Sequence, residues 1–215
     1  MKLDVPLYLQ KKGSVDCGII CTQMILEYYG IQELFSDLKN KLNVDEVGLY
    51  APQIGIYFLE NGFSVELVTQ HPGLFTIRDQ GTSQVEISKR FEDLISNSKS
   101  DQDKKVLNFF LKYQEHGGKI DVKIPDMTDI MGEIKNNRPL ITLFTSHFLT
   151  ELNPDFDFHY NVITGFDKRY LYLNNPYSDN RGGKKKYLID NFFYGLYSSV
   201  YADLDNGCFL KLKKR

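Results

Sequence analysis

Apolar side chains recur along this chain in two rhythms, one typical of helices and the other typical of strands. From Cys17 onward they are spaced three or four residues apart, and Gly30 offers the left-handed cap that ends many helices. The apolar face of this first helix consists of Ile20, Met24, Ile25 and Tyr28. Similar patterns predict further helices at residues 33–42, 51–60, 85–96, 101–114 and 125–135, and a last one within residues 187–197.

Strand-like segments gather in the final third of the chain. An early one lies at residues 63–68, and the others lie at residues 139–144, 158–166, 170–173 and 208–212. We expect residues 73–83 to form an exposed loop, and residues 182–186, with their glycines and lysines, to form an exposed connection. A mostly helical N-terminal half and a sheet-rich C-terminal part predict an α+β fold, with helices packed on an antiparallel sheet and a cleft between them.

The composition is that of a folded protein with little net charge. At 215 residues the chain has the length of one ordinary domain, which we expect to span residues 1–215. The formal net charge is only -2, so no broad positive field would attract nucleic acid. The three cysteines, Cys17, Cys21 and Cys208, include no CxxC pair, so we predict neither a disulfide framework nor a metal site, and no cofactor.

The chain shows no sign of membrane insertion or export. Its N-terminal segment lacks an apolar signal core, and no stretch approaches the roughly 18 uninterrupted apolar residues needed to span a bilayer. Unpaired cysteines agree with a reducing compartment. We therefore expect a cytoplasmic protein that does not enter a membrane.

Cys17 is the first candidate for chemistry, because it stands at the start of a helix. Asp16 precedes it as the expected helix cap, and Gly18 follows it, leaving room for a substrate to approach. Free peptide N–H groups and the helix dipole favour a thiolate there, which would make the cysteine a nucleophile. The alternative is that Cys17 is a small buried residue without a reactive role.

A cysteine nucleophile needs a base, and the chain has four histidines. His71 precedes a proline in a loop-like segment, and His116 stands at an expected helix end, where a basic side chain favours the dipole. His147 follows an apolar strand and is harder to dismiss. His159 is the best candidate, because it opens an alternating strand that would hold its ring in one direction.

Asn175 is the candidate orienter of that histidine. If residues 158–166 and the next strand form a hairpin, its end returns to His159, so the Asn175 side chain can accept the Nδ1 proton. Asn174 lies on the opposite face by strand alternation, unless a bend at Pro176 reverses the two. An ordinary turn at the end of a hairpin would also explain this segment.

Gln10 is the candidate oxyanion donor. A side-chain amide just upstream of the nucleophile can donate to the developing oxyanion, together with the backbone N–H of Cys17. One such donor is typically worth about 3 kcal/mol in the transition state.

These residues resemble a known superfamily. The residues that carry the likeness are Gln10, Asp16-Cys17-Gly18, Met24, Tyr28-Tyr29-Gly30, His159-Tyr160 and Gly165. Their order is similar to that of the bacteriocin-processing, double-glycine leader peptidases, which belong to the papain-like cysteine peptidases. One branch, the guanylyl-cyclase-domain-containing family, resembles the chain nearly end to end. The features shared with this branch are Val5-Pro6, Asn174-Asn175-Pro176, Asp179, Asn191-Phe192 and the acidic segment at Asp203 and Asp205.

The resemblance implies a papain-like fold with Cys17 as nucleophile, His159 as base, Asn175 as orienter and Gln10 as oxyanion donor. The chain departs from the pattern at two positions. The leader peptidases usually carry aspartate where Asn175 stands, although papain itself uses asparagine. Gln10 lies seven residues before Cys17, one more than the usual six.

The branch label suggests guanylyl cyclase as an alternative function. Cyclisation of GTP normally needs acidic residues that hold divalent metals and cations that contact the triphosphate. Asp155, Asp157 and Asp167 are the candidate acids, and residues 182–186 could meet phosphates. Loops and a hairpin turn are the favoured explanation of each of these features, and the chain has neither a P-loop nor a GxGxxG motif.

The sequence therefore favours a cysteine hydrolase that acts on a peptide or isopeptide bond in a peptide or protein substrate. A catalytically inactive binding module on the same scaffold is a third hypothesis. The residue range 85–114 and the loop at residues 145–158 are the expected walls of the cleft. Neither the identity of the substrate nor the oligomeric state can be read from the sequence.

Overall fold

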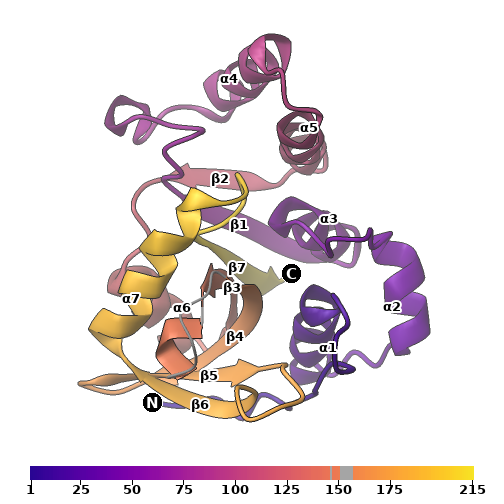
Figure 1. The fold of residues 1–215 in the computed structure, drawn as a ribbon, viewed down its shortest axis with the longest axis vertical. Helices are drawn as coiled ribbons and strands as arrows, with labels where there is room; N and C mark the ends of the chain where they lie inside the picture. The colour runs from indigo at the N-terminus through magenta and orange to yellow at the C-terminus, as the bar shows by residue number, and fades with distance from the viewer. Residues whose placement is uncertain (146, 151–156) are drawn as a thin grey trace.

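A seven-stranded sheet organises the computed structural model, which describes residues 1–145, 147–150 and 157–215 (Figure 1). The strands are β1 Phe63–Thr69, β2 Lys119–Val122, β3 Leu140–Thr145, β4 Phe158–Phe166, β5 Tyr170–Asn175, β6 Gly183–Leu188 and β7 Cys208–Lys214. Their order across the sheet is β2-β1-β7-β3-β4-β5-β6. Neighbouring strands pair antiparallel, apart from β1 and β2, which run parallel.

Seven α-helices are described around this sheet. They are α1 Cys17–Tyr28, α2 Phe35–Leu42, α3 Ala51–Glu60, α4 Gln84–Asn97, α5 Asp101–Glu115, α6 Met127–Lys135 and α7 Ile189–Ser198. Short 3₁₀ turns occur at η1 Ile77–Asp79, η2 His147–Thr150 and η3 Ser199–Tyr201. Each expected helix is confirmed, and so is the α+β fold.

Two strands, β2 and β6, were not expected from the sequence. β2 has only four residues, and it is held at the sheet edge partly by Gln84, whose side-chain amide bonds both backbone groups of Ile120. β6 contains three lysines in a row, a composition typical of an edge strand. The expectation of an exposed connection at residues 182–186 is therefore wrong. In the mostly helical N-terminal half, β1 confirms the strand expected at residues 63–68.

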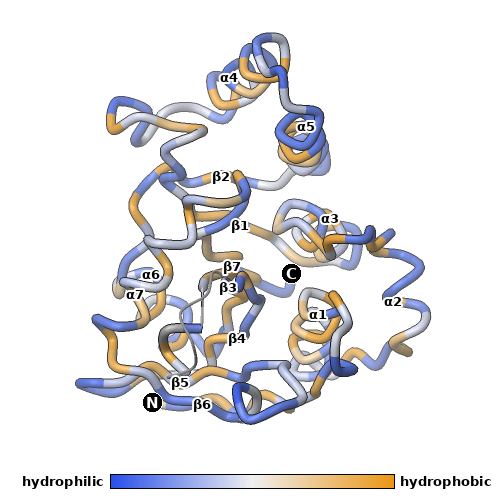
Figure 2. The backbone as a smooth tube through the Cα atoms, in the orientation of Figure 1, coloured by the Kyte–Doolittle hydropathy of each residue, from blue (hydrophilic) through white to orange (hydrophobic). Residues whose placement is uncertain are grey.

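Helices cover the sheet on both sides (Figure 1). α1 packs on β4 and α3 packs on β1, whereas α6 and α7 pack on β3, β4 and their neighbours from the other side. Hydrophobic stretches run through the central strands and α1, and hydrophilic ones prevail in α2 and the loops (Figure 2). The core includes fully buried Met24, Phe58, Phe144 and Phe209. This packing fixes the start of α1 against β4.

The N-terminal segment is fastened to the same part of the sheet. Lys2 forms a bridge with Gly165 of β4, and the N–H of Leu3 donates to the carbonyl of Thr164 at 2.7 Å. Further along, the N–H of Gln10 donates to the carbonyl of Pro176 at 2.7 Å. The segment therefore delivers Gln10 to the end of β5. No helix in the described part of the chain is long and apolar enough to cross a membrane.

Candidate active site

Cys17 is the first residue of α1 and is partly buried. Asp16 occupies the N-cap position but makes no side-chain capping bond, because its backbone (φ -85°, ψ 8°) is not the extended conformation that such a bond needs. Its carboxylate instead accepts from the Lys39 ammonium at 2.9 Å. The predicted role of Asp16 as a side-chain cap is therefore wrong, whereas the position of Cys17 in the first turn is confirmed.

Gly18 has a packing role and not the predicted role of giving the substrate room. A Cβ atom at this position would lie 3.2 Å from side-chain atoms of both Leu49 and Ile54. The absence of a side chain at Gly18 therefore lets the start of α1 pack against the side chains of Leu49 and Ile54.

Cys17 opens onto a cleft of about 460 Å³ that His159 and Gln10 also line. Exposed Val15 and Val47 form an apolar part of its wall, and the charged residues Lys12, Asp157, Asp179 and Arg181 line another part. The prediction that residues 85–114 form a wall of the cleft is wrong. These residues form α4 and α5, which lie beyond β2 and contribute no residue to the lining. Of the expected loop at residues 145–158, residues 157 and 158 line the cleft, and residues 146 and 151–156 lie outside the described part.

His159 lies on β4, where it pairs with Phe144 of β3, and its side chain is buried. Its ring stacks face to face on Tyr177, with centroids 3.6 Å apart and an interplanar angle of 2°. Nε2 is buried without a hydrogen-bond partner. Burial, and next the positive charge of Arg181, lower the pKa of this imidazole to about 3. Within the described residues, no hydrogen bond joins it to Cys17.

The two asparagines at the end of β5 face opposite ways. Asn174 donates its amide to the carbonyls of Val5 and Pro6, at 3.1 and 3.0 Å. Asn175 is fully buried, and its Oδ1 accepts from the Tyr177 N–H at 3.0 Å while its Nδ2 has no partner. Among the described contacts, no hydrogen bond links Asn175 to His159. Nε2 of the histidine is buried without a partner, whereas the sequence predicts that Asn175 accepts the Nδ1 proton.

Asn161 and Tyr187 add two further buried polar groups that the sequence reasoning missed. Because Val162 pairs with Asn174, the neighbouring Asn161 comes to lie opposite Asn175 on the next strand. Asn161 Oδ1 and His159 Nε2 are buried and without partners. The buried Tyr187 hydroxyl lies near the Asn175 side chain, although no close hydrogen bond joins the two among the described contacts. Asn161 could have been found from the sequence, since it stands two residues after His159 and so shares its face.

Gln10 reaches the cleft through a tight turn. The Ser14 N–H donates to the Lys11 carbonyl at 3.0 Å, and Gly13 takes the left-handed conformation (φ 74°) that favours glycine. The Gln10 side chain curls over this turn, where Nε2 donates to the Ser14 carbonyl at 2.8 Å. Its Oε1 is buried without a partner. The turn accommodates the seven-residue separation from Cys17 and still leaves Gln10 on the cleft wall.

A charged cluster covers the outer face of Tyr177. The Arg181 guanidinium lies 3.9 Å from the centre of the Tyr177 ring, opposite His159. Arg181 pairs with Asp179 at 2.7 Å and with Asp157 at 3.3 Å, and the Tyr177 hydroxyl also donates to Asp157. Sequence reasoning gave no role to Tyr177 or Arg181, because only the turn after β5 brings them over His159.

The other three histidines occupy different surroundings. His147 lies beside the charged cluster, with Nδ1 3.5 Å from Asp157 and Nε2 3.3 Å from Arg181. His71 is buried away from the cleft, and its Nδ1 accepts from the Gly73 N–H at 3.0 Å. His116 caps the end of α5, as its position in the sequence predicts.

The protonation of the cysteine differs from the expectation. Burial raises the pKa of the Cys17 thiol to about 11, and the charge of Asp157 acts in the same direction. Backbone N–H groups of Tyr160 and Gly18 lower the pKa, but by less. Desolvation therefore outweighs the helix terminus, and the resting pair consists of a neutral thiol and a neutral imidazole.

The acids that a nucleotide cyclase would need do not come together. Asp157 joins the cleft cluster, whereas Asp167 accepts backbone N–H groups in the turn before β5, at the opposite end of that strand from Asn175. Asp155 lies outside the described residues. Among the residues that are described, no group of three or more His, Cys, Asp or Glu side chains is arranged to hold a metal.

Comparison with known proteins identifies the family of this chain. A model of the Peptidase_C39 like family matches residues 2–204. The chain belongs to this family. No curated protein matches it.

Solved structures with a fold similar to that of this chain include the following three. One is a double glycine motif protease from an AMS/PCAT transporter in complex with the leader peptide, with 15% identity and a TM-score of 0.53 over 100% of this chain and 94% of that chain. A Bacillus anthracis protein described as a C39-like peptidase gives 12% identity and a TM-score of 0.55, over 100% and 98%. The peptidase domain of Streptococcus ComA, a bifunctional ABC transporter, gives 13% and 0.50, over 97% and 98%.

Family membership confirms the expectation of a papain-like cysteine peptidase and of the leader-peptidase superfamily. At identities this low, the solved structures bear on the fold alone. The narrower guanylyl-cyclase-domain branch gains no support from these comparisons.

Proposed function

We propose that this protein hydrolyses a peptide or isopeptide bond with Cys17 as nucleophile and His159 as general base. The observation that carries the proposal is that a thiol at the start of a buried helix shares one cleft with His159 and with Gln10. The chain belongs to a peptidase family, and acyl transfer needs a nucleophile, a base and an oxyanion donor close together. The thiol, the imidazole and the amide can supply these three groups.

The reaction starts from a neutral pair. As the substrate carbonyl approaches Sγ, His159 takes the thiol proton, so that the thiolate forms only as the new C–S bond forms. His159 then gives this proton to the leaving amine, which breaks the C–N bond and leaves a thioester on Cys17. Water, activated by the same imidazole, hydrolyses the thioester and restores the thiol.

The developing oxyanion is held by two donors in this proposal. One is the backbone N–H of Cys17, and the other is Gln10, whose Nε2 has a second hydrogen beyond the one given to Ser14. An extended peptide substrate suits a cleft that offers apolar side chains at Val15 and Val47 together with polar and charged side chains. The leader peptide bound by one of the structural neighbours supports a peptide substrate for this chain as well.

Asn175 is proposed to orient His159. Its Oδ1 accepts the Tyr177 N–H, and a carbonyl oxygen can accept a second hydrogen bond, here from His159 Nε2. Catalytic hydrogen bonds often tighten only when the substrate is bound, and we propose that the bond between Asn175 and His159 forms at that stage. A neutral amide holds the tautomer without the charge that an aspartate would add.

Replacing Cys17 by Ala is expected to lower kcat/KM for a peptide substrate at least about a thousandfold, because the acyl-enzyme can no longer form. The measurement uses a library of fluorogenic peptides, together with a peptide-based electrophile that labels the thiol. The wild-type protein should be labelled at Cys17, and His159→Ala should slow this labelling.

The matched control is Cys21→Ala, which removes a thiol one helical turn further along α1, buried and outside the cleft. This variant should keep both turnover and labelling. Undiminished turnover by the Cys17→Ala protein would disprove the assignment. A folded wild-type protein that binds peptides without turnover or labelling would favour an inactive binding module.

The cyclase alternative predicts a different result, namely GTP turnover that needs Mg²⁺ or Mn²⁺ and is unaffected by loss of Cys17. No observation on the described residues favours it, because Asp157 is engaged by Tyr177 and Arg181 and Asp167 serves a turn. We therefore propose the peptidase function alone.

A further inference from the structure

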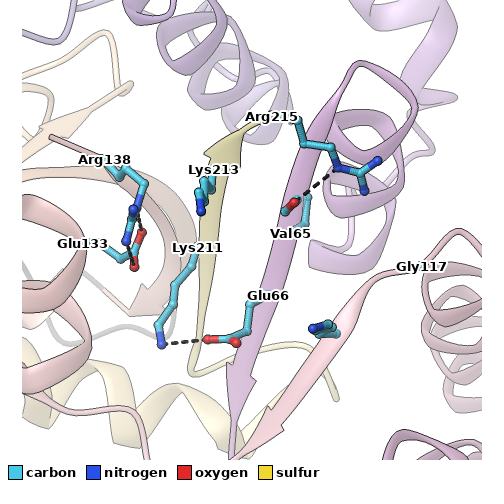
Figure 3. A pocket seen from close by; sticks show the side chains of 10 residues that line it. Val65, Glu66, Gly117, Glu133, Arg138, Lys211, Lys213 and Arg215 are labelled. Atoms are coloured by element: carbon cyan, nitrogen blue, oxygen red, sulfur yellow. Dashed lines mark hydrogen bonds and ion pairs between the residues drawn. The ribbon is translucent and has the colours of Figure 1, made fainter. Parts of the chain in front are cut away.

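A second hollow, of about 300 Å³, lies on the outward side chains of β1 and β7 (Figure 3). Ser64 and Glu66 of β1 and Lys211 and Lys213 of β7 point into it, on the side of the sheet opposite α3. It shares no lining residue with the cleft at Cys17. The peptidase proposal therefore gives it no role.

Positive charge dominates this hollow. Its charged lining residues are the basic Lys119, Arg138, Lys211, Lys213 and Arg215 and the acidic Glu66 and Glu133. The whole chain carries 26 basic and 28 acidic residues, so the excess of cations here is local. A concave surface of one sign concentrates ions of the opposite sign.

Two of the cations are held rigidly by carboxylates. Lys211 lies between Glu66 and Asp129, at 2.9 Å from each. Arg138 donates to both carboxylate oxygens of Glu133 (Figure 3). These ion pairs hold the side chains of Lys211 and Arg138 in place, so a ligand would bind to groups that are already ordered.

The remaining cations have fewer partners. Within the described residues, Lys119 and Lys213 form no ion pair with a side-chain carboxylate. Arg215 donates its Nε to the Ser64 hydroxyl at 3.2 Å, which leaves its terminal nitrogens free for another acceptor. Neighbouring like charges repel, so an anion that binds among them gains both attraction and relief of that repulsion.

The spacing of the cations indicates an anion with more than one charged group. Glu66 pairs in register with both Lys119 and Lys211, so these lysines lie two strand spacings apart, roughly 10 Å. Lys213 lies two residues further along β7, roughly 7 Å away. These distances separate backbone positions, from which the long lysine side chains reach over the hollow. An anion with linked phosphate groups offers separate oxygens to ammonium groups that approach from different strands.

We propose that this hollow binds a small anion with two or three linked phosphate groups, either free or attached to a nucleoside. Lys119 and Lys213 supply the ammonium groups that contact the phosphates, and Arg215 adds guanidinium N–H donors. Lys211 and Arg138, fixed by their carboxylates, shape the site.

Isothermal titration calorimetry of the full chain with inorganic pyrophosphate tests the proposal. We expect saturable binding at one site, and at least about tenfold weaker binding by the double variant Lys119→Gln, Lys213→Gln, because two charge-assisted contacts are lost. Both lysines are exposed, so the variant should unfold at the same temperature as the wild type.

The matched control is Lys99→Gln with Lys168→Gln, which removes two exposed charges elsewhere on the surface. Its affinity should stay within about twofold of the wild type. An equal loss in both double variants, no saturable binding by the wild type, or orthophosphate binding as tightly as pyrophosphate would each overturn the proposal. Much tighter binding of ADP than of pyrophosphate would identify a nucleoside-linked ligand, and equal binding would identify the free anion.

Discussion

At the scale of single residues, the candidate site depends on a stack of three side chains. The imidazole of His159, the ring of Tyr177 and the guanidinium of Arg181 lie one on another, at 3.6 and 3.9 Å. The stack buries His159 and places a positive charge near it, and both effects favour its neutral form. Tyr177 therefore holds the proposed base in a fixed plane.

Tyr177→Leu is expected to lower kcat/KM about three- to tenfold, because an aromatic stack of this kind contributes about 0.5–1.5 kcal/mol. Tyr177→Phe keeps the ring and loses only the hydroxyl bond to Asp157, so it should stay close to the wild type. Steady-state kinetics on one peptide substrate compare the two variants. Equal losses in both would show that the hydroxyl and not the stack matters.

Some residues of the cleft could be predicted from the sequence around them, whereas others are placed there only by the fold. Cys17, His159 and Gln10 could be predicted to meet, because a helix start, a strand start and an upstream amide are each visible in the sequence. Tyr177 and Arg181 could not, since their positions depend on how the chain turns after β5. The direction of the Cys17 pKa was also mispredicted, because burial is a property of the folded cleft.

At the scale of elements, Tyr113 locks α5 to the sheet. Its hydroxyl lies within hydrogen-bond distance of the carbonyls of Val65 and Lys119, at 3.0 and 2.9 Å, and shares its one proton between them. Its ring lies against Gly55 of α3, where a Cβ atom would come within 2.6 Å, and against Gly118, where it would come within 2.4 Å. These glycines are thus required by a close approach between elements, which the sequence pattern of each element does not reveal.

Gly55→Ala is expected to lower the free energy of unfolding by about 1–3 kcal/mol, because the added methyl group overlaps the buried Tyr113 ring. Gly132→Ala in α6 is the control, since nothing lies within 4 Å of a Cβ atom there. Alanine favours a helix, so this variant should gain up to about 1 kcal/mol. Urea unfolding measures both, and a destabilised Gly132→Ala protein would contradict the packing argument.

The sequence correctly predicted helices and strands where the apolar pattern was long, and it failed to predict strands where that pattern was short or absent. α3 and β4 occur with the expected bounds, because apolar periodicity over nine or ten residues is a strong signal. β2 has four residues and β6 is rich in lysine, so neither carries such a pattern. Both became strands only because a partner strand lay beside them.

At the scale of the whole molecule, Asp205 joins segments that are far apart in the chain. Its Oδ2 accepts from the N–H of Ala51, at the start of α3, at 2.7 Å, and from the Tyr160 hydroxyl of β4 at 3.1 Å. The carboxyl is buried, and burial is the main cause that raises its pKa to about 7. This contact ties the segment before β7 to both α3 and the strand that carries His159.

Asp205 should make the protein less stable as the pH rises. The folded state keeps the proton up to about pH 7, whereas an unfolded aspartate loses it near pH 3.8, so the stabilisation is complete below pH 3.8 and is lost as the pH rises to 7. A shift of this size corresponds to about 4 kcal/mol. Asp205→Asn should remove this part of the pH dependence.

Urea unfolding of the wild type and the Asp205→Asn variant at pH 4, 5, 6 and 7 measures the difference. The gap in free energy of unfolding should change steadily over this range, because the other titrating groups are common to both proteins. Parallel pH profiles would show that Asp205 is ionised at its usual pKa.

The sequence by itself determined the periodic helices and strands, the α+β class and the identities of the groups that could do chemistry, because these follow from local spacing and residue type. Tertiary structure alone decided that Asp16 pairs with Lys39, that Gly18 packs against Leu49, and that Tyr177 covers His159. It also decided the basic hollow, where side chains of β1, β2 and β7 meet. Burial, charge proximity and stacking arise from segments distant in the chain, and no local pattern encodes them.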